Sequence, residues 1–467
     1  TEVLHDEKGR PAGVVIANRA GRQAVRAKIV IDATARATAA RAAGAEFRPW
    51  PAGPHTFQRI VVGGPLREGN GIVEGKTAGI HFYSREGEHD VHVYQLKIPM
   101  PDAGPASFAA AEVLARDWTF TAEVVDESDR LFLIPPDPMI ARANVTGNST
   151  DPATLDLAAL QPAKLDRLYL LGGCAGVSRK AAAELVHPLN QMRLGQRLGA
   201  HAAKLAQTLP PSRGVQVFAK AADPSAKTRG DVREFLNGAR PTHRGLPTIP
   251  SPRRRLPVLG EYDVVVAGGG TGGAPAGIGA GRQGASTLVI EFQDHLGGVG
   301  TQGLISSYYH GYRKGFTVEV DTGVAEIGGP KRKGGWNPVT KREWWRRANA
   351  KAGTQIWFST LACGAWVVDG TVRGVIVATP QGRGVVLAST VVDSTGNSDI
   401  AVAAGADFIT TSAEHVAMQG TGLSPRALGT GYMNTDYSFA DESDVVGQWR
   451  MIVAARRKYR NSYDLSS

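Results

Sequence analysis

The sequence predicts an α/β fold built on a parallel sheet, and it predicts that part of this fold occurs twice. Three observations support this prediction. A glycine-rich turn joins an apolar strand to a small-residue helix just after residue 263. Two apolar strands, ending at Asp32 and Asp393, are each followed by an alanine-containing helix. The segments around these two strands align with each other without a gap, which is typical of an internal repeat.

The repeat covers residues 13–47 and 374–408, an offset of 374 − 13 = 361, and 16 of its 35 positions are identical. The matches include four pairs: Gly21 with Gly382, Arg22 with Arg383, Asp32 with Asp393, and Thr34 with Thr395. Two unrelated apolar βα segments rarely match this closely over such a length, so we interpret the repeat as a duplicated module.

The chain then divides into three parts. We expect residues 1–208 to be the later part of a first module and residues 261–467 the earlier part of a second. Residues 209–260, rich in Pro and Arg, form a linker in which we expect little regular structure. A partner chain, or segments outside this sequence, would complete each module. A single permuted module is the alternative. However, residues 1–208 and 261–467 each contain the strand that ends in an aspartate, Asp32 or Asp393, so these two strands would occupy the same position in one module. The opening "TEVLHDEKGR" also predicts a chain that begins away from its native start.

Composition excludes several classes of protein. The two cysteines, Cys174 and Cys363, cannot form a zinc site, a cysteine-ligated cluster or a disulfide framework, and we expect no metal. The net charge of +10 is spread over the chain, which predicts solvated surface rather than a nucleic-acid site. No apolar run reaches the roughly 18–20 residues of a membrane span. We expect a soluble protein, with no signal peptide in this sequence and an unknown compartment.

The stretch "DVVVAGGGTGGAPAGIGAGRQGASTLVIE", residues 263–291, has the pattern of a Rossmann-like dinucleotide-binding unit. Gly268 permits the tight turn, Gly270 lets the backbone approach a pyrophosphate, and Gly273 allows close helix packing; Gly272 belongs to the same loop. The helix N-terminus favours phosphate. Glu291, at the end of the next strand, is placed to accept hydrogen bonds from ribose hydroxyls.

Further motifs resemble the FAD-dependent oxidoreductases of the two-dinucleotide-binding-fold type. "LGGVGTQG" follows Glu291, a β-meander precedes a strand ending in "DSTG", and "LYLLGGCAGVSRKAAAELVHPLNQM" resembles the closing segment of that family. The resemblance implies a Rossmann-like FAD-binding domain with a parallel sheet, a β-meander and an added α+β substrate region. It implies cofactor contacts for Gly297, Gly298, Thr301, Cys363, Thr395, Gly396, Gly172 and Gly173. It also implies FAD as the cofactor.

The resemblance predicts an enzyme that passes hydride from an organic substrate, such as a carbohydrate, a polyol or an amine, to a flavin. A non-catalytic or scaffold flavoprotein subunit and an NAD-dependent dehydrogenase are the alternatives. Neither the substrate nor the electron acceptor follows from the sequence.

Catalytic candidates cluster in "SSYYHGYRKGF", residues 306–316. His310 is a candidate base, Tyr309 a hydroxyl or stacking contact, and Arg313 an anion anchor. His187 is a second candidate base. For Cys174, His295, Trp344 and Trp345 we favour a role in packing. His295 is also a candidate for covalent flavin attachment.

Overall fold

The protein is described from a computed structural model. The structure describes residues 2–18, 21–84, 87–147, 151–218, 230–234, 247–251, 255–308, 313–329, 335–409, 444–447, 449–450 and 453. Residues 1–406 form one compact unit, and residues 407–467 are assigned to a second. Everything below concerns the first unit.

Its largest sheet has seven strands in the order β11-β15-β16-β17-β12-β13-β14. These are β11 Asp231–Glu234, β15 Leu361–Val368, β16 Thr371–Thr379, β17 Gly382–Asp393, β12 Val258–Ala267, β13 Thr287–Ile290 and β14 Gln355–Trp357. The last four run parallel, and the first three extend the sheet as an antiparallel meander. The predicted parallel sheet and β-meander are therefore confirmed. The first of the parallel strands begins at Val258, several residues earlier than the sequence pattern predicted.

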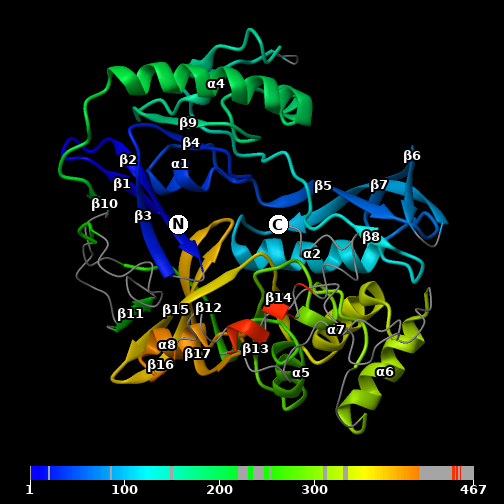
Figure 1. Ribbon diagram of the computed structural model, residues 1–467. Helices are drawn as coiled ribbons and strands as arrows, with labels where there is room; N and C mark the ends of the chain where they lie inside the picture. The colour runs from blue at the N-terminus through cyan, green and yellow to red at the C-terminus, as the bar shows by residue number, and fades with distance from the viewer. Residues whose placement is uncertain are drawn as a thin grey trace. The chain divides into compact units, whose positions relative to one another are not determined.

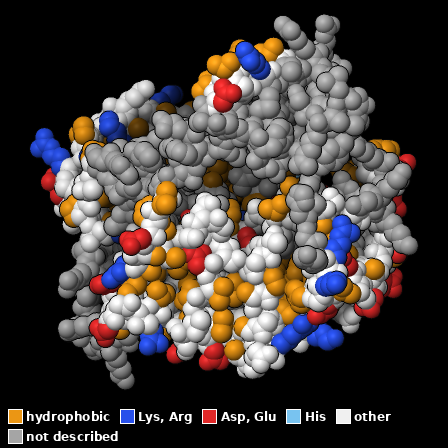
Figure 2. Space-filling model, turned by 60° about the horizontal axis from the view of Figure 1, so that its bottom comes forward, with side chains coloured by type: hydrophobic (Ala, Val, Ile, Leu, Met, Phe, Trp, Pro, Cys, Tyr) orange, Lys and Arg blue, Asp and Glu red, His pale blue; other side chains and the backbone are white. Residues whose placement is uncertain are grey.

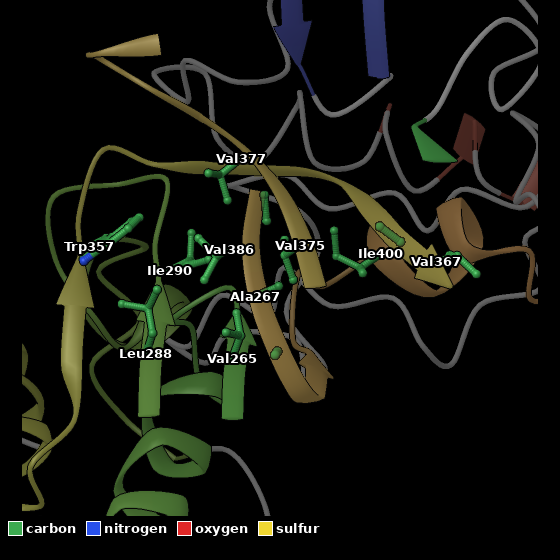
Figure 3. Packing of buried hydrophobic residues seen from close by; sticks show 13 residues of the cluster. Val265, Ala267, Leu288, Ile290, Trp357, Val367, Val375, Val377, Val386 and Ile400 are labelled. Atoms are coloured by element: carbon green, nitrogen blue, oxygen red, sulfur yellow. The ribbon is translucent and has the colours of Figure 1, made fainter. Parts of the chain in front are cut away.

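The core of this sheet is a layer of aliphatic side chains on one face. Figure 3 shows Val265 of β12 and Leu288 of β13 in one layer with Val375 of β16 and Val386 of β17. Strands that alternate in this way bury every second side chain, and each fully buried Val, Leu or Ile contributes about 1.5–3 kcal/mol.

Four helices pack on the large sheet or on one another. They are α5 Gly273–Arg282, α6 Phe316–Ile327, α7 Pro338–Lys351 and α8 Asp399–Ala404. Helices α5 and α7 pack on its parallel strands, α6 packs on α7, and α8 packs on β15 of the meander. Helix α5 contacts β12, β13 and α7 (Figure 1). The tryptophans of α7, Trp344 and Trp345, are buried in this layer, so packing on the core accounts for both.

The first part of the chain contains a second meander and a short parallel pair. The meander has the order β10-β1-β2-β3, and β4 pairs in parallel with β9. The elements are β1 Glu2–His5, β2 Pro11–Asn18, β3 Gly21–Arg26, β4 Val30–Asp32, α1 Thr38–Ala42, β9 Leu168–Leu170, α3 Arg179–Leu185, α4 Pro188–Thr208 and β10 Gln216–Val217. The segment after Ser178 forms two helices, because Pro188 lacks an N–H and starts a new helix.

An added α+β region lies between these elements in sequence. Its antiparallel sheet has the order β6-β7-β5-β8, with β5 Gly53–Val62, β6 Ile72–Ser84, β7 Gly87–Met100 and β8 Asp126–Glu127. Helix α2, Pro105–Thr119, packs on β7, and a short 3-10 helix follows at Leu157–Leu160. This matches the added α+β region that the resemblance implied.

The two aligned segments fold with the same local hydrogen bonds. Asp32 Oδ1 accepts from the N–H and hydroxyl of Thr34, and its Oδ2 accepts from the N–H of Ala40. Asp393 makes the corresponding bonds with Thr395 and with the N–H of Ala401, 361 residues later. The hydrogen bonds of the turn after each aspartate are therefore repeated along with the sequence.

The linker adds one edge strand to each meander. Strand β10 pairs with β1, and β11 pairs with β15. Glu234 of β11 lies 3.1 Å from Arg22 and 2.8 Å from Arg383, and Glu2 lies 2.8 and 3.1 Å from the same two guanidinium groups. These ion pairs join the two parts of the chain near residue 383.

Charged side chains of both signs are interspersed on the face drawn in Figure 2, between hydrophobic patches. Where the figure colours that face, the basic residues do not merge into one continuous surface. Within the part of the chain that the structure describes, no helix is long and apolar enough to cross a membrane.

Candidate functional site

The glycine loop turns sharply between β12 and α5. Gly268 has φ 93°, and a Cβ there would lie 2.4 Å from the carbonyl oxygen of Ser394. A Cβ on Gly273 would lie 1.7 Å from the carbonyl oxygen of Gly268. Both positions therefore require glycine, the first for its backbone conformation and the second for helix–strand contact.

The start of α5 is open to a ligand. Its N-cap residue, Gly272, offers no side-chain hydrogen bond, and the first N–H groups of a helix have no partner within the helix. The atom nearest to a Cβ on Gly270 would be the Cα of Gly298, at 4.0 Å. The loop thus leaves a space beside free N–H groups and the positive end of the helix dipole, which suits a phosphate.

Glu291 stands at the end of β13, beside this loop. Its Oε2 accepts the N–H of Gly269 at 2.7 Å, and its Oε1 accepts the N–H of Gln293 at 2.8 Å. Burial raises the pKa of the Glu291 carboxyl, and these hydrogen bonds oppose the shift. Each carboxylate oxygen keeps a further lone pair, so the group can still accept from ribose hydroxyls.

The glycines that follow Glu291 pack directly on the loop. The N–H of Gly297 donates to Gly269 O at 2.9 Å, and a Cβ on Gly298 would lie 3.0 Å from the Cα of Gly270. Thr301 is buried and donates its hydroxyl to Leu296 O at 2.7 Å. The structure therefore brings Gly297 and Gly298 to the glycine loop, with Thr301 packed beside them.

The strand-end turn of the second segment also reaches the loop. A Cβ on Gly268 would lie 3.1 Å from the Cα of Thr395. Gly396 has φ 85°, and a Cβ there would meet no atom within 4 Å. Cys363, in contrast, points into the core: its thiol is buried, and burial raises its pKa to about 12.

Gly172 and Gly173 lie elsewhere. They follow β9 in the first part of the chain and line a cavity with Thr34 and the residues after β14. No described contact joins them to the glycine loop. The neighbouring Cys174 is buried, and burial raises the pKa of its thiol, which fits a packing role.

Of the three predicted catalytic residues, Tyr309 and His310 lie outside the described residues. Arg313 is exposed, with its guanidinium carbon 5.0 Å from the ring centroid of Tyr308. The Tyr308 hydroxyl donates to Asp321 at 3.0 Å, and burial together with this bond raises its pKa to about 12.

Lys341, on α7, is a candidate that the sequence did not single out. Its ammonium nitrogen lies 3.3 Å from the ring centroid of Trp336, whose indole N–H donates to Gly300 O at 2.7 Å. Burial lowers the pKa of Lys341 to about 8, with Asp321 opposing the shift. None of the described acids forms an ion pair with it. A buried amine with this pKa, next to the glycines at 297–300, can exchange a proton near neutral pH.

The other histidines have different surroundings. His187 is exposed at the N-cap of α4. His295 is buried, with Nε2 2.9 Å from Glu127 and Nδ1 2.7 Å from Asp294. Both ring nitrogens of His295 thus have carboxylate partners, which accounts for its burial. Among the described residues, no group of three His, Cys, Asp or Glu side chains is placed to hold a metal ion.

The residues present fit a dinucleotide: an open helix N-terminus, a loop that admits no Cβ at Gly268 or Gly273, and a carboxylate on the adjacent strand. Fold and loop together define a dinucleotide-binding α/β protein. Residues 263–461 match the model of the FAD dependent oxidoreductase family. Its cofactor is FAD.

Solved structures show weaker likeness. THI4 from Thermovibrio ammonificans is 20% identical over 31% of this chain and 61% of that one, with a TM-score of 0.25. A geranylgeranyl bacteriochlorophyll reductase-like protein from Thermoplasma acidophilum is 20% identical over 35% of this chain and 48% of that one, with a TM-score of 0.26. The chain thus spans less than two thirds of either protein. No curated protein matches it in sequence.

Proposed function

We propose that this chain is an FAD-dependent oxidoreductase that removes a hydride and a proton from an organic substrate. The observation that carries the proposal is the packing of Gly298 on Gly270, beside the open N-terminus of α5. This packing brings the phosphate-binding loop and the glycines after Glu291 into one surface, as a long dinucleotide requires.

Within this proposal each group of residues has a task. The loop from Gly268 to Gly273 holds the pyrophosphate through backbone N–H groups, and Glu291 holds the adenosine ribose. When bound, FAD supplies the hydride acceptor. Thr395 and Gly396 support the loop from the adjacent strand end.

Lys341 is the described residue best suited to take up a substrate proton. Its pKa of about 8 leaves a substantial neutral fraction at slightly alkaline pH, and a neutral amine is a base. The aromatic ring of Trp336 on one side and the backbone at Gly300 on the other fix its position. Arg313 and Tyr308 lie in the same cluster and could orient an anionic or hydroxylated substrate.

The first experiment measures the visible absorption spectrum of the purified chain, before and after incubation with FAD. We expect a flavin band that stays with the protein on gel filtration. A chain that never retains FAD would refute the proposal, and retention of NAD alone would favour a nicotinamide-dependent enzyme.

The second experiment tests chemistry. The FAD-loaded chain is mixed anaerobically with sugars, polyols, amines and hydroxy acids, and bleaching of the flavin band is followed. Bleaching by one class identifies the substrate type. Stable FAD binding with no bleaching by any class would favour a scaffold flavoprotein.

A further inference from the structure

His295 is a buried histidine whose two ring nitrogens contact different parts of the fold. Its Nε2 lies 2.9 Å from Oε1 of Glu127, which belongs to β8 of the added α+β region. Its Nδ1 lies 2.7 Å from the carboxylate of Asp294, the preceding residue. The ring therefore makes one local contact and one contact that joins residues 168 positions apart.

Glu127 is held in place by its own region. Arg59 of β5 and Arg116 of α2 are both buried, and both donate to its carboxylate. The backbone of Glu127 pairs with Val61 of β5. A buried side chain with several hydrogen bonds of this kind is held rigidly. Glu127 is thus a fixed anchor to which the ring of His295 is attached.

His295 directly precedes the segment that packs on the glycine loop. Leu296 is fully buried, and a Cβ on Gly269 would lie 2.4 Å from its Cδ2. The N–H of Gly297 donates to Gly269 O at 2.9 Å, and Gly298 follows at the contact with the loop described above. Any shift of residue 295 would therefore be passed directly to these contacts.

The two glycines of this segment need support from their neighbours. Gly297 has φ 101° and Gly298 has φ 52°, so both lie in the left-handed region. Glycine loses more conformational freedom on ordering than any other residue, so side-chain contacts on either side must hold such a turn. After the turn, Thr301 donates its hydroxyl to Leu296 O at 2.7 Å. Before the turn, His295 provides the anchored side chain.

We propose that His295 is a positioning residue for the cofactor site. Through Nε2 and Glu127, it fixes Gly297 and Gly298 against the glycine loop, so that the α+β region contributes to the affinity for FAD. This inference rests on the FAD site proposed above. It gives the contact between Glu127 and His295 a task in addition to stability.

Two variants separate the two contacts of the ring. In His295→Asn the amide nitrogen takes the place of Nδ1, so it can still donate to Asp294 but is too short to reach Glu127. In His295→Gln the amide nitrogen takes the place of Nε2, so the donation to Glu127 can persist. A role in positioning through Glu127 predicts that only the first variant disturbs the segment after residue 295.

The first measurement is hydrogen–deuterium exchange of the Gly297 amide in the full chain without FAD. We expect exchange about ten-fold faster in His295→Asn and within about three-fold of the wild type in His295→Gln. Exchange at the wild-type rate in His295→Asn would overturn the proposal. Equal acceleration in both variants would also overturn it, because the contact with Glu127 would then not be the cause.

His92→Asn is the matched control for a general loss of stability. His92, in β7, is buried to the same extent as His295, and its ring nitrogens lie 3.2 Å from Thr77 Oγ1 and 2.8 Å from Gly64 O. None of these described partners belongs to residues 294–301. We expect Gly297 to exchange at the wild-type rate in this variant. Acceleration as large as in His295→Asn would mean that lost stability explains the effect, and the positioning role would be wrong.

The second measurement is the affinity for FAD, from quenching of flavin fluorescence during titration with each protein. We expect binding about ten-fold weaker for His295→Asn and unchanged for His92→Asn. Faster Gly297 exchange without weaker binding in His295→Asn would overturn the role in the cofactor site. A wild-type chain that binds no FAD would instead refute the proposed function, whereas the exchange rates without FAD test the contact with Glu127 independently.

Discussion

The contact between Gly273 and Gly268 gives the sharpest test of the glycine loop. In Gly273→Ala the new methyl group would lie 1.7 Å from the carbonyl oxygen of Gly268 and 3.2 Å from the Cβ of Ser394. The first of these neighbours is backbone, so a rotamer change cannot relieve the overlap. Overpacking of this kind typically costs 1–3 kcal/mol, and we expect the upper end, about 3 kcal/mol, because the loop itself must move. The displaced loop should also lose FAD.

Gly279→Ala is the matched control in the same helix. Gly279 is exposed, and a Cβ there would meet nothing within 4 Å. Replacing a helix-interior glycine with alanine should stabilise by about 0.8–1 kcal/mol. The two variants should therefore differ by about 4 kcal/mol in the free energy of unfolding by urea, and only Gly273→Ala should lower the flavin-to-protein absorbance ratio. Wild-type stability and full FAD content in Gly273→Ala would refute the reasoning.

Three further predictions concern charged groups. Glu291→Gln should weaken FAD binding by about ten-fold or more but leave FMN binding unchanged, because FMN lacks the adenosine ribose. Glu127→Gln should lower the free energy of unfolding by about 3–5 kcal/mol, because it leaves buried Arg59 and Arg116 without their carboxylate. Lys341→Met should slow flavin reduction by about 10²–10⁴-fold and leave FAD retention unchanged. Equal reduction rates for the two proteins would remove Lys341 as the base.

Two of these groups also make stability depend on pH. Burial by itself raises the pKa of Glu127, but the charges of Arg59 and Arg116 outweigh it and lower the pKa well below 4.5. Its stabilisation is present above the unfolded-state pKa and is lost as pH falls through the lower folded-state value. For Lys341 the folded-state pKa of about 8 lies below the ordinary 10.5, so the unfolded chain binds its proton more tightly. Wild-type stability should rise relative to Lys341→Met between pH 8 and 10.5.

Exposed ion pairs provide the control for Glu127. Arg282 and Glu319 form a pair in which both side chains are nearly half exposed. Arg282→Gln should change stability by less than about 1 kcal/mol, because solvent screens such pairs. A loss as large as that of Glu127→Gln would mean that burial does not explain the difference.

The glycine loop could be predicted from sequence because its requirements are local. Gly268, Gly273 and Glu291 act through backbone conformation, helix packing and strand register, which short stretches encode. Lys341 could not be predicted in this way. It lies in the polar run "KREWWRR", and its lowered pKa arises only when tertiary packing places it on Trp336.

The linker strands show a second limit. Residues 209–260 are rich in Pro and Arg and predict little regular structure, yet β11 forms there because the edge of the β15 meander offers free hydrogen-bonding groups to a nearby extended segment. The cavity that Gly172 and Gly173 line also joins Arg36 to Trp357, more than 300 positions apart, and no spacing rule links them. The predicted base His310 stays a prediction.

The shared hydrogen bonds of Asp32 and Asp393 have a consequence for protein engineering. A chimaera in which residues 261–393 run directly into residues 33–208 would keep the bonds that the two turns share, because Thr34 and Ala40 stand where Thr395 and Ala401 now stand. In that chimaera β17 would take the place of β4 beside β9. The ends of β4 and β17 are thus equivalent crossover points, at which one continuous sheet could be assembled from two.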